Sequence, residues 1–227
     1  MLFQLDEFAD LPSQYNIAPG QDIYAVRGII MRDEEARSAS TGSFQKEVAP
    51  LRWGLIPFWS KEPKSGPINA RSETVTEKPT FKASFKQRRC LIPADGFYEW
   101  QKKSEGPKQP FFIHMKDKKP FALAGIWDIW KNLGGDKIES CSILTTEPNE
   151  VVKPIHKRMP VIIEPKKFDT WLDTSKQNLD EALAMLKPYD AKAMEAHTVN
   201  LYVNSPSNKG EKCIEEFHEK YKQQKLF

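Results

Sequence analysis

The sequence predicts an α+β fold in which a curved, mainly antiparallel, barrel-like sheet is covered by several amphipathic helices. Eight short stretches combine β-branched and aromatic residues between turn residues, as strands do. Four other segments place apolar side chains at helical spacing. The 17 prolines are spread through the chain, which is typical of short strands and irregular loops and not of a helical bundle. Helices with one apolar face must cover an apolar surface, and a sheet supplies it.

The strands are predicted from alternation and from bounding turn residues. Residues 89–100, "RCLIPADGFYEW", form the longest such stretch, and a single acid, Glu99, stands there between two aromatic residues. The predicted strands span 22–30, 52–56, 89–100, 110–115, 121–130, 140–146, 158–163 and 198–204.

The helices are predicted from apolar stripes and from prolines near their first turn, where a missing N–H costs little. One predicted helix has Pro79 in its first turn, followed by Phe81 and Phe85 four residues apart on one face. A second has Pro165 at its start, followed on one face by Phe168, Trp171 and Leu172. Leucines in 179–186 and Ile214, Phe217 and Tyr221 complete the set. The predicted helices span 77–87, 164–172, 179–186 and 213–221, and the polar segments 33–46 and 102–110 are expected to be the least ordered.

Length and composition bound the class of protein. With 227 residues, 39% of them hydrophobic, the chain is expected to form a single domain over 1–227 with a real core. A net charge of +3 is too mild to establish a nucleic-acid partner. Three cysteines without metal-ligand spacing indicate neither a disulfide framework nor a zinc site, and no cofactor is expected. Without an apolar run long enough for a membrane span, the chain is expected in the cytoplasm, or in the nucleus of a eukaryote.

Polar residues fall at shared faces of three segments, because residues two apart in a strand point the same way. Asn69 and Arg71 form one such pair, and His156 and Arg158 another, while Glu99 shares a face with Phe97. Together they offer an amide, two guanidiniums, a carboxylate and an imidazole, which suit anion binding and acid–base chemistry.

Each of these residues also has an ordinary structural interpretation. Glu99 could face solvent or hold an ion pair, and His156 could be a surface histidine in a solvated basic cluster. Asn69 could cap the following turn, and Trp53 and Trp59 could belong to the core. The residues alone establish a soluble α+β domain with a candidate polar cleft.

Seven blocks in order are similar to the SOS-response-associated peptidase (SRAP) family, abasic-site sensors that cross-link to single-stranded DNA. The resemblance covers nearly the whole chain and is most specific in "INARSET", "RCLIPADGFYEW" and "HKRMP". The blocks are "YNIAPGQ", "LRWGLIPFWSK", "INARSET", "RCLIPADGFYEW", "AGIWD", "SILTTEPN" and "IHKRMPVII".

The resemblance implies roles for individual residues. The active site is implied to contain Asn69, Glu99 and His156. Phosphates near the lesion are implied to contact Arg71 and Arg158. The loop with Asn16 and Pro19, together with Trp53 and Trp59, is implied to shape the DNA-binding surface.

The resemblance also implies a chemistry and partners. The implied partner is single-stranded DNA with abasic sites, and 3′-junctions are a second candidate partner. The protein is implied to act as a monomer away from membranes, in the cytoplasm and at the nucleoid when bound to DNA. In the family a cysteine behind the initiator Met, exposed by autoproteolytic removal of that Met, closes a thiazolidine with the sugar aldehyde, and a lyase-type step reverses the link. A carboxylate with a raised pKa can serve as acid and base in these steps.

The beginning of the chain departs from this pattern. Position 2 is Leu2, and "YNIAPGQ" begins at Tyr15, nearer the start than in the family. Three explanations are open: a start at an internal Met, natural loss of the nucleophile, or a substitute thiol. Cys90 is expected to be a buried, inert thiol, and Cys141 and Cys213 are weaker candidates still. No internal cysteine has an α-amine beside its thiol, so none can form the same five-membered ring.

Three functions therefore compete. The first is an abasic-site sensor whose intact form cross-links to DNA and belongs to the SOS response, the second a non-covalent single-stranded-DNA-binding module, and the third a cysteine peptidase acting on other proteins. The absence of a cysteine in a catalytic context with a histidine speaks against the third.

Overall fold

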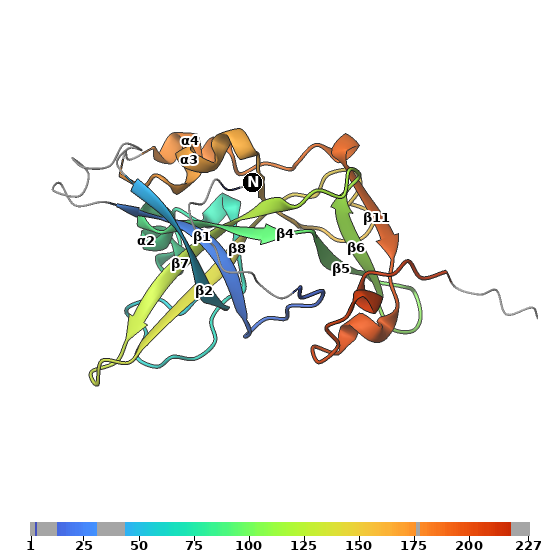
Figure 1. Cartoon of the computed structure of the whole chain (residues 1–227), viewed down its shortest axis with the longest axis horizontal. Coiled ribbons are helices and arrows are strands. Elements are labelled where there is room, and N and C mark those ends of the chain that lie inside the picture. The colour runs from blue at the N-terminus through green and yellow to red at the C-terminus, as the bar shows by residue number, and fades with distance from the viewer. Residues whose placement is uncertain (1–2, 4–12, 31–43, 176–177, 219–227) are drawn as a thin grey trace, which may run out of the picture.

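Five strands close into a barrel in the computed structural model, which describes residues 3, 13–30, 44–175 and 178–218 (Figure 1). Four of the five pairings around the ring are antiparallel, and only β2 and β8 run parallel. The predicted curved, mainly antiparallel, barrel-like sheet is thereby confirmed. The ring consists of β1 (Asp22–Ile30), β2 (Phe44–Trp53), β8 (Lys137–Thr146), β7 (Phe121–Lys131) and β4 (Arg89–Ala94).

Three short strands extend this sheet and bring distant segments to the end of β8. β3 (Asn69–Arg71) runs parallel to β8 and places Arg71 opposite Thr145. β9 (Met159–Pro160) is antiparallel to β8 and places Pro160 opposite the same threonine. β10 (Ile162–Ile163) then pairs with β7. Segments 69–71 and 156–160 consequently meet at Thr145.

A second sheet stands beside the barrel, to its right in Figure 1, and consists of β5 (Gly96–Gln101), β6 (Gln109–Met115) and β11 (Met194–Thr198). Only Asp95 separates β4 from β5, so the chain passes directly from one sheet to the other. One face of the second sheet, with Phe97 and Ile113, shares a hydrophobic cluster with the barrel residues Ile23 and Leu51. Glu99 stands two residues after Phe97 on β5, so both side chains lie on the same face of the strand. This face is directed at the barrel.

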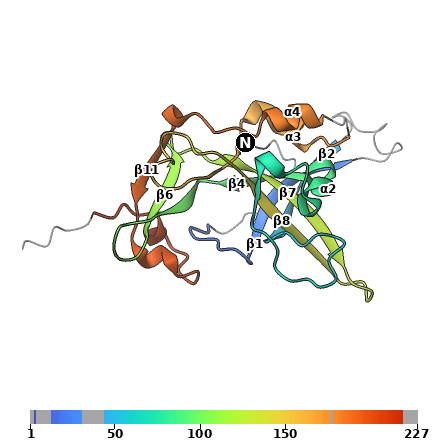
Figure 2. The same ribbon diagram turned by 180° about the vertical axis from the view of Figure 1, so that it is seen from behind.

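Three helices cover the outside of the barrel: α2 (Pro79–Gln87), α3 (Phe168–Leu172) and α4 (Leu179–Ala184) (Figure 2). A 3₁₀ turn, η2 (Pro165–Lys167), precedes α3. Phe85 and Trp171 are buried against Leu91 and Leu144 in the outer cluster. The helices predicted over 77–87, 164–172 and 179–186 are confirmed, although Leu183 of the third is 38% exposed and Ala182 is its buried residue.

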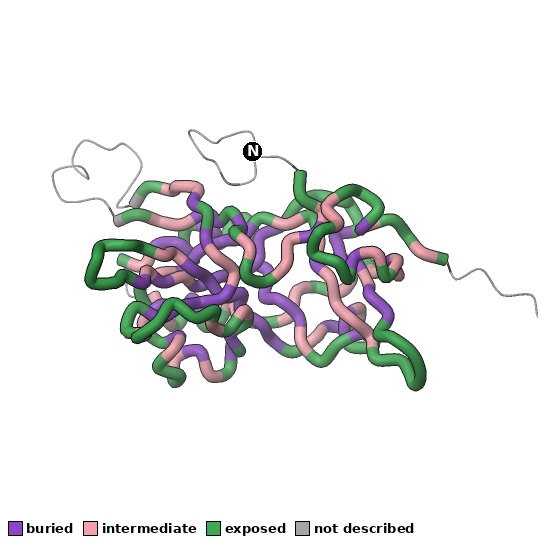
Figure 3. Tube along the Cα trace, turned by 90° about the horizontal axis from the view of Figure 1, so that it is seen from below, coloured by how far each residue is buried: buried purple, intermediate pink, exposed green. Residues whose placement is uncertain are grey.

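Buried segments run through the interior of the molecule (Figure 3). They belong to three hydrophobic clusters: one shared by the barrel and the second sheet, one between the barrel and its helices, and a small one with Phe112, Val199, Val203 and Cys213. No helix in the described part of the chain has the length and apolarity needed to cross a membrane.

Two predicted strands are each divided in the structure: residues 89–100 form β4 and β5 in different sheets, and residues 158–163 form β9 and β10. Two other predicted elements are wrong. The strand over 198–204 is instead the end of β11 followed by a 3₁₀ turn, η4 (Leu201–Asn204). The helix over 213–221 is not formed in its described part: Cys213 ends a 3₁₀ turn, η5 (Glu211–Cys213), and Phe217 N–H donates to Thr198 O at 2.8 Å. Extended pairing with the end of β11 satisfies backbone groups that a short isolated helix would leave unpaired. Residues 219–221 lie outside the described residues.

The predicted strand over 52–56 covers only the end of β2, which begins at Phe44. Its first residues are mixed polar, so alternation did not reveal them. Of the segment 33–46, residues 33–43 lie outside the described residues, and residues 102–108 form the loop between β5 and β6.

Candidate active site

Glu99 lies on β5 with its side chain only 21% exposed. Burial raises the pKa of this carboxyl group to about 7, while the charge of His156 and a hydrogen bond from the Trp100 backbone act in the opposite direction. A carboxyl group with this pKa exists in both protonation states at neutral pH, so it can donate or accept a proton.

His156 is the partner of this carboxylate. Its Nδ1 lies 3.3 Å from Glu99 Oε1, 3.1 Å from Arg158 O and 3.3 Å from Arg158 N. Its Nε2 has no hydrogen-bond partner among the described residues and is available to a substrate. The Arg158 N–H group donates to Nδ1, whereas the Glu99 carboxylate and the Arg158 carbonyl oxygen are acceptors there. The two acceptors, which lie as close as the donor or closer, favour a proton on Nδ1 and a lone pair on Nε2.

The segment that carries His156 is fixed by side chains that the sequence did not single out. Asn149 Oδ1 accepts from the backbone N–H groups of Val151 and Val152 at 3.2 and 3.1 Å. His156 N–H then donates to Val152 O at 2.9 Å. Gln101 Nε2 donates to Pro154 O at 3.0 Å, which ties this segment to the strand of Glu99. The signal available in the sequence was only that Gln101 follows Glu99 at the same strand parity.

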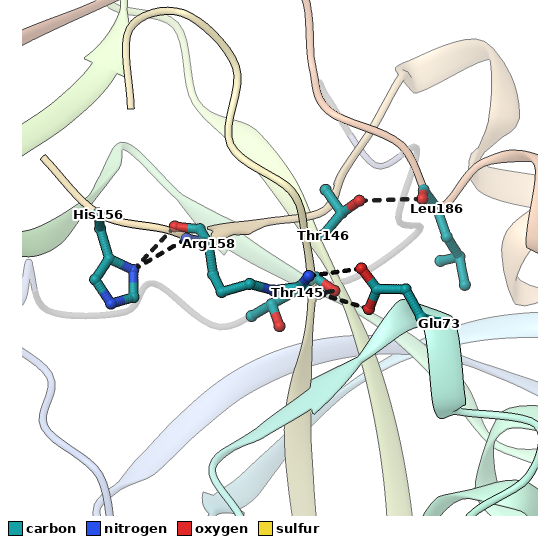
Figure 4. A network of polar contacts seen from close by, with 6 residues as sticks. All are labelled: Glu73, Thr145, Thr146, His156, Arg158 and Leu186. Carbon is teal, nitrogen blue, oxygen red and sulfur yellow. Dashed lines mark hydrogen bonds and ion pairs between the residues drawn. The ribbon is translucent and has the colours of Figure 1, made fainter. Parts of the chain in front are cut away.

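Arg158 is engaged within the protein. Its Nη1 and Nη2 donate to the two carboxylate oxygens of Glu73 at 2.6 and 2.8 Å, and Nη2 also donates to Thr145 O at 2.5 Å (Figure 4). The hydrogen bonds from this guanidinium lower the pKa of Glu73 to about 2. The predicted phosphate contact at Arg158 thus stands in a bidentate ion pair in the free protein.

Asn69 and Arg71 lie on β3 with their side chains exposed and the buried Ala70 between them, as strand parity predicts. Neither side chain has a hydrogen bond or ion pair within the described part of the chain. Arg71 stands opposite Thr145, the residue whose carbonyl oxygen binds Arg158. The structure therefore brings Asn69, Arg71, His156 and Arg158 to one end of β8, and His156 to Glu99.

A model of the SOS response associated peptidase (SRAP) family matches residues 3–206 of this sequence. The chain belongs to this family. The SRAP chain is similar along most of its length to three proteins that bear the name abasic site processing protein. YoqW of Bacillus subtilis (strain 168) is 39% identical over 218 residues, which cover 94% of this chain and 92% of YoqW. YoaM of the same organism is 40% identical, and HMCES of Rattus norvegicus is 32% identical over 76% of this chain and 57% of HMCES.

Solved structures of similar shape support the SRAP fold. A protein from Bordetella bronchiseptica superposes with a TM-score of 0.71 at 28% identity over 88% of this chain and 93% of that chain. A protein from Bacteroides thetaiotaomicron superposes with a TM-score of 0.69 at 32% identity over 76% of this chain and 78% of that chain.

Four further residues were implied by the resemblance to shape the DNA-binding surface. Two of them make hydrogen bonds within the protein, and two are exposed. Asn16 is buried, and its Nδ2 donates to Val203 O and Ser205 O at 2.9 and 3.1 Å, so it fixes the loop and leaves Pro19 exposed. Trp53 is half-buried and donates from Nε1 to Ile68 O at 2.9 Å. Trp59 is 55% exposed.

All three thiols of the SRAP chain are buried. Burial raises the pKa of Cys90 and Cys213 and raises that of Cys141 to about 12. Each thiol is therefore protonated and shielded at neutral pH, and a substitute internal nucleophile is not supported by this structure.

Proposed function

We propose that this chain is an abasic-site sensor that binds single-stranded DNA, with Glu99 and His156 as its acid–base pair. The observation that carries the proposal is the 3.3 Å contact between His156 Nδ1 and a buried carboxylate whose pKa is raised to about 7. The names of the relatives agree with it, because they are abasic site processing proteins.

DNA binding is assigned to exposed side chains at the Thr145 end of β8 and to Trp59, whose neighbours Phe58 and Ser60 are bonded to Asp128 and Trp130 nearer the start of β8. Arg71 binds a phosphate beside the lesion, and Asn69 hydrogen-bonds the deoxyribose. Trp59 offers an exposed aromatic face for an unstacked base. Modest net charge is compatible with this role, since phosphate contacts need only a local group of basic residues.

The geometry supports the following proton transfers. An abasic sugar opens to its aldehyde when a base removes the proton of the C1 hydroxyl group, the C1–O4′ bond breaks and O4′ takes up a proton. His156 Nε2 holds the lone pair that accepts the hydroxyl proton. An amine then adds to the aldehyde carbon, and the resulting carbinolamine loses water to give an imine. Glu99 donates the proton that leaves with that water. A neighbouring thiol closes the ring by adding its sulfur to the imine carbon and its proton to the imine nitrogen.

The amine and thiol of this reaction belong, in the intact family protein, to an N-terminal cysteine exposed by removal of the initiator Met. The internal thiols, Cys90, Cys141 and Cys213, are all buried. We therefore expect that none of these three thiols forms a thiazolidine with an abasic site.

A second candidate, a non-covalent single-stranded-DNA-binding module, is favoured by the burial of the three thiols. Free L-cysteine distinguishes it from the first, because free cysteine carries both an α-amine and a thiol and can serve as an added nucleophile. In this rescue assay the chain is mixed with abasic single-stranded DNA and free L-cysteine. The rate at which the cysteine–DNA adduct forms is measured by mass spectrometry. An acid–base catalyst accelerates adduct formation, whereas a binding module does not.

The expected results are specific to Glu99 and His156. The wild-type chain accelerates adduct formation. Glu99→Gln and His156→Ala each reduce this acceleration by roughly 10²-fold, while DNA binding persists. Glu105→Gln, an exposed acid on the loop after β5, serves as the control and is expected to match wild type. Equal rates with and without the protein would remove the catalytic role.

A further inference from the structure

Two histidines meet on the second sheet, where β6 and β11 lie side by side (Figure 1). His114 of β6 and His197 of β11 are 83 residues apart in the chain, yet His114 Nε2 lies 3.3 Å from His197 Nδ1. Both side chains point away from the barrel, because Ile113, which packs against it, has the opposite strand parity to His114. Neither ring belongs to the acid–base pair or to the DNA-binding groups proposed above.

A backbone carbonyl oxygen fixes the tautomer of each ring. His114 Nδ1 lies 2.9 Å from Met115 O, and His197 Nε2 lies 2.8 Å from Ile214 O. A carbonyl oxygen can only accept, so each of these two nitrogens carries the proton of its neutral ring. The other two nitrogens, His114 Nε2 and His197 Nδ1, consequently each carry a lone pair where the rings meet.

Two lone pairs at this distance repel unless an electron-pair acceptor lies between them. A proton satisfies them only if one ring becomes an imidazolium or gives up its carbonyl partner, and 3.3 Å exceeds the about 2.7–3.2 Å of ordinary N–H hydrogen bonds. A tetrahedral Zn²⁺ ion, with Zn–N bonds of about 2.0–2.1 Å, separates two ligand nitrogens by about 3.3–3.4 Å. The observed separation therefore fits two ligands of one ion.

The surroundings of the two rings are those of metal-ligating histidines. In such sites the second ring nitrogen donates to a carboxylate or a backbone carbonyl oxygen, which orients the ring toward the ion. His114 and His197 both have this arrangement. Phe112 stacks on the His114 ring with 5.3 Å between centroids, and only 9% of the His114 side chain is exposed. The His114 ring is therefore held in place by its packing.

Glu195 brings a carboxylate to the same pair. Its Oε1 lies 3.7 Å from His114 Nε2, and 47% of its side chain is exposed, so a small rotation can bring an oxygen to the ion. No three His, Cys, Asp or Glu side chains in the described part of the chain are already gathered as a metal site. The preformed part is consequently the histidine pair, and the carboxylate and one water molecule would complete four ligands.

We propose that His114 and His197 form a binding site for a divalent transition metal of the zinc class, with Glu195 as the third protein ligand. The proposal does not rest on the proposed function, because the site lies on the opposite face of the second sheet from Glu99. A bound ion joins β6 to β11, and through the bond between His197 and Ile214 O it also fixes the segment after η5. Its role is to stabilise this part of the fold, not to take part in catalysis.

Two variants remove the ligand nitrogens but keep the bonds that orient the side chains. His114→Asn retains an N–H group near the position of Nδ1 and has no atom at the position of Nε2. His197→Gln retains an N–H group near the position of Nε2 and has no acceptor at the position of Nδ1. His218→Ala is the matched control, because His218 also lies 3.7 Å from a carboxylate, that of Glu216, but its side chain is 81% exposed.

The first measurement is a calorimetric titration of the full chain with Zn²⁺ after dialysis against a chelator. Wild type and His218→Ala are expected to bind one ion with equal affinity and to melt at a higher temperature in its presence. His114→Asn and His197→Gln are expected to lose more than the roughly tenfold to hundredfold in affinity that loss of an orienting partner costs. Glu195→Gln is expected to weaken binding less than either histidine variant, since an amide oxygen can still bind the ion.

The second measurement replaces Zn²⁺ by Co²⁺, whose visible absorption reports the geometry of its ligands. The expected spectrum has the strong visible band of a tetrahedral ion and no near-ultraviolet band of a thiolate ligand. A folded wild type that does not bind Zn²⁺, or histidine variants that bind it as wild type does, would overturn the proposal. So would binding that is lost in His156→Ala and kept in His114→Asn, which would place the ion at the acid–base pair. A thiolate band would place the ion at a cysteine and overturn the proposal as well.

Discussion

Replacing Glu99 by glutamine should make the folded protein more stable at alkaline pH. Burial raises the pKa of Glu99 from the ordinary value of 4.5 to about 7. Between these two values the folded chain holds a proton that the unfolded chain has released, so wild-type stability falls as the pH rises. Above pH 7 both states are ionised, and the folded state bears the full cost of a buried carboxylate.

The expected change in unfolding free energy follows from the pKa shift of Glu99. A change from 4.5 to about 7, at 1.36 kcal/mol per pKa unit, corresponds to about 3 kcal/mol. Because 21% of the side chain is exposed, we take this value as an upper bound. The amide side chain of the Glu99→Gln variant is neutral at every pH. The difference in unfolding free energy between this variant and wild type should therefore grow by up to about 3 kcal/mol from pH 4.5 to pH 8.

Urea denaturation at pH 4.5, 5.5, 6.5 and 8 measures this difference directly. Glu105→Gln, an exposed substitution on the adjoining loop, is the control and should follow wild type at each pH. Parallel stability curves for Glu99→Gln and wild type would refute the reasoning, and so would a variant that loses stability relative to wild type as the pH rises.

Three further outcomes are expected. His156→Ala should raise the pKa of Glu99 further, because the charge of His156 opposes the effect of burial; carboxyl-selective NMR titration measures it, and an unchanged or lower pKa would contradict the contact. Trp59→Ala should weaken binding to single-stranded DNA by about 1–3 kcal/mol in equilibrium titrations while leaving the melting temperature unchanged, and equal affinity would remove Trp59 from the DNA surface. Trp171→Ala, which empties a fully buried site beneath α3, should lower the unfolding free energy by about 3–5 kcal/mol in urea, and a loss below about 1 kcal/mol would contradict its place in the core.

The sequence predicted the elements whose signal is local. Pro79 with Phe81 and Phe85 marks a helix start and its buried face within nine residues, and the structure confirms both. The first part of β2 has mixed polar residues, among them Glu47, which lies opposite Arg27 of β1 and forms an ion pair with it. The sequence of the strand itself does not reveal such a pairing. The segment after Cys213 has helical spacing, yet backbone pairing with β11 at Phe217 and Thr198 prevails.

The alternation of side chains along a strand predicted which residues share a face, but it did not predict which residues they contact. The alternation in 69–71 correctly put Asn69 and Arg71 on one exposed face. It gave no indication that Glu73 would reach Arg158, because that contact depends on β3 and β9 meeting on either side of β8. The pairing of Glu99 with His156 likewise joins residues far apart in the chain, and only the resemblance to a family suggested that they share a site. Strand parity could not tell that the Arg158 guanidinium would pair with Glu73 while Arg71 stays exposed on β3.

The most direct test of the central claim compares wild type with Glu99→Gln in the rescue assay between pH 5.5 and 8.5. If Glu99 donates a proton during adduct formation, the rate advantage of wild type should be large at low pH. It should decline as the pH rises through about 7, where Glu99 loses that proton. Equal rates for the two proteins across the whole range would contradict the assignment of Glu99 as the acid at an abasic site.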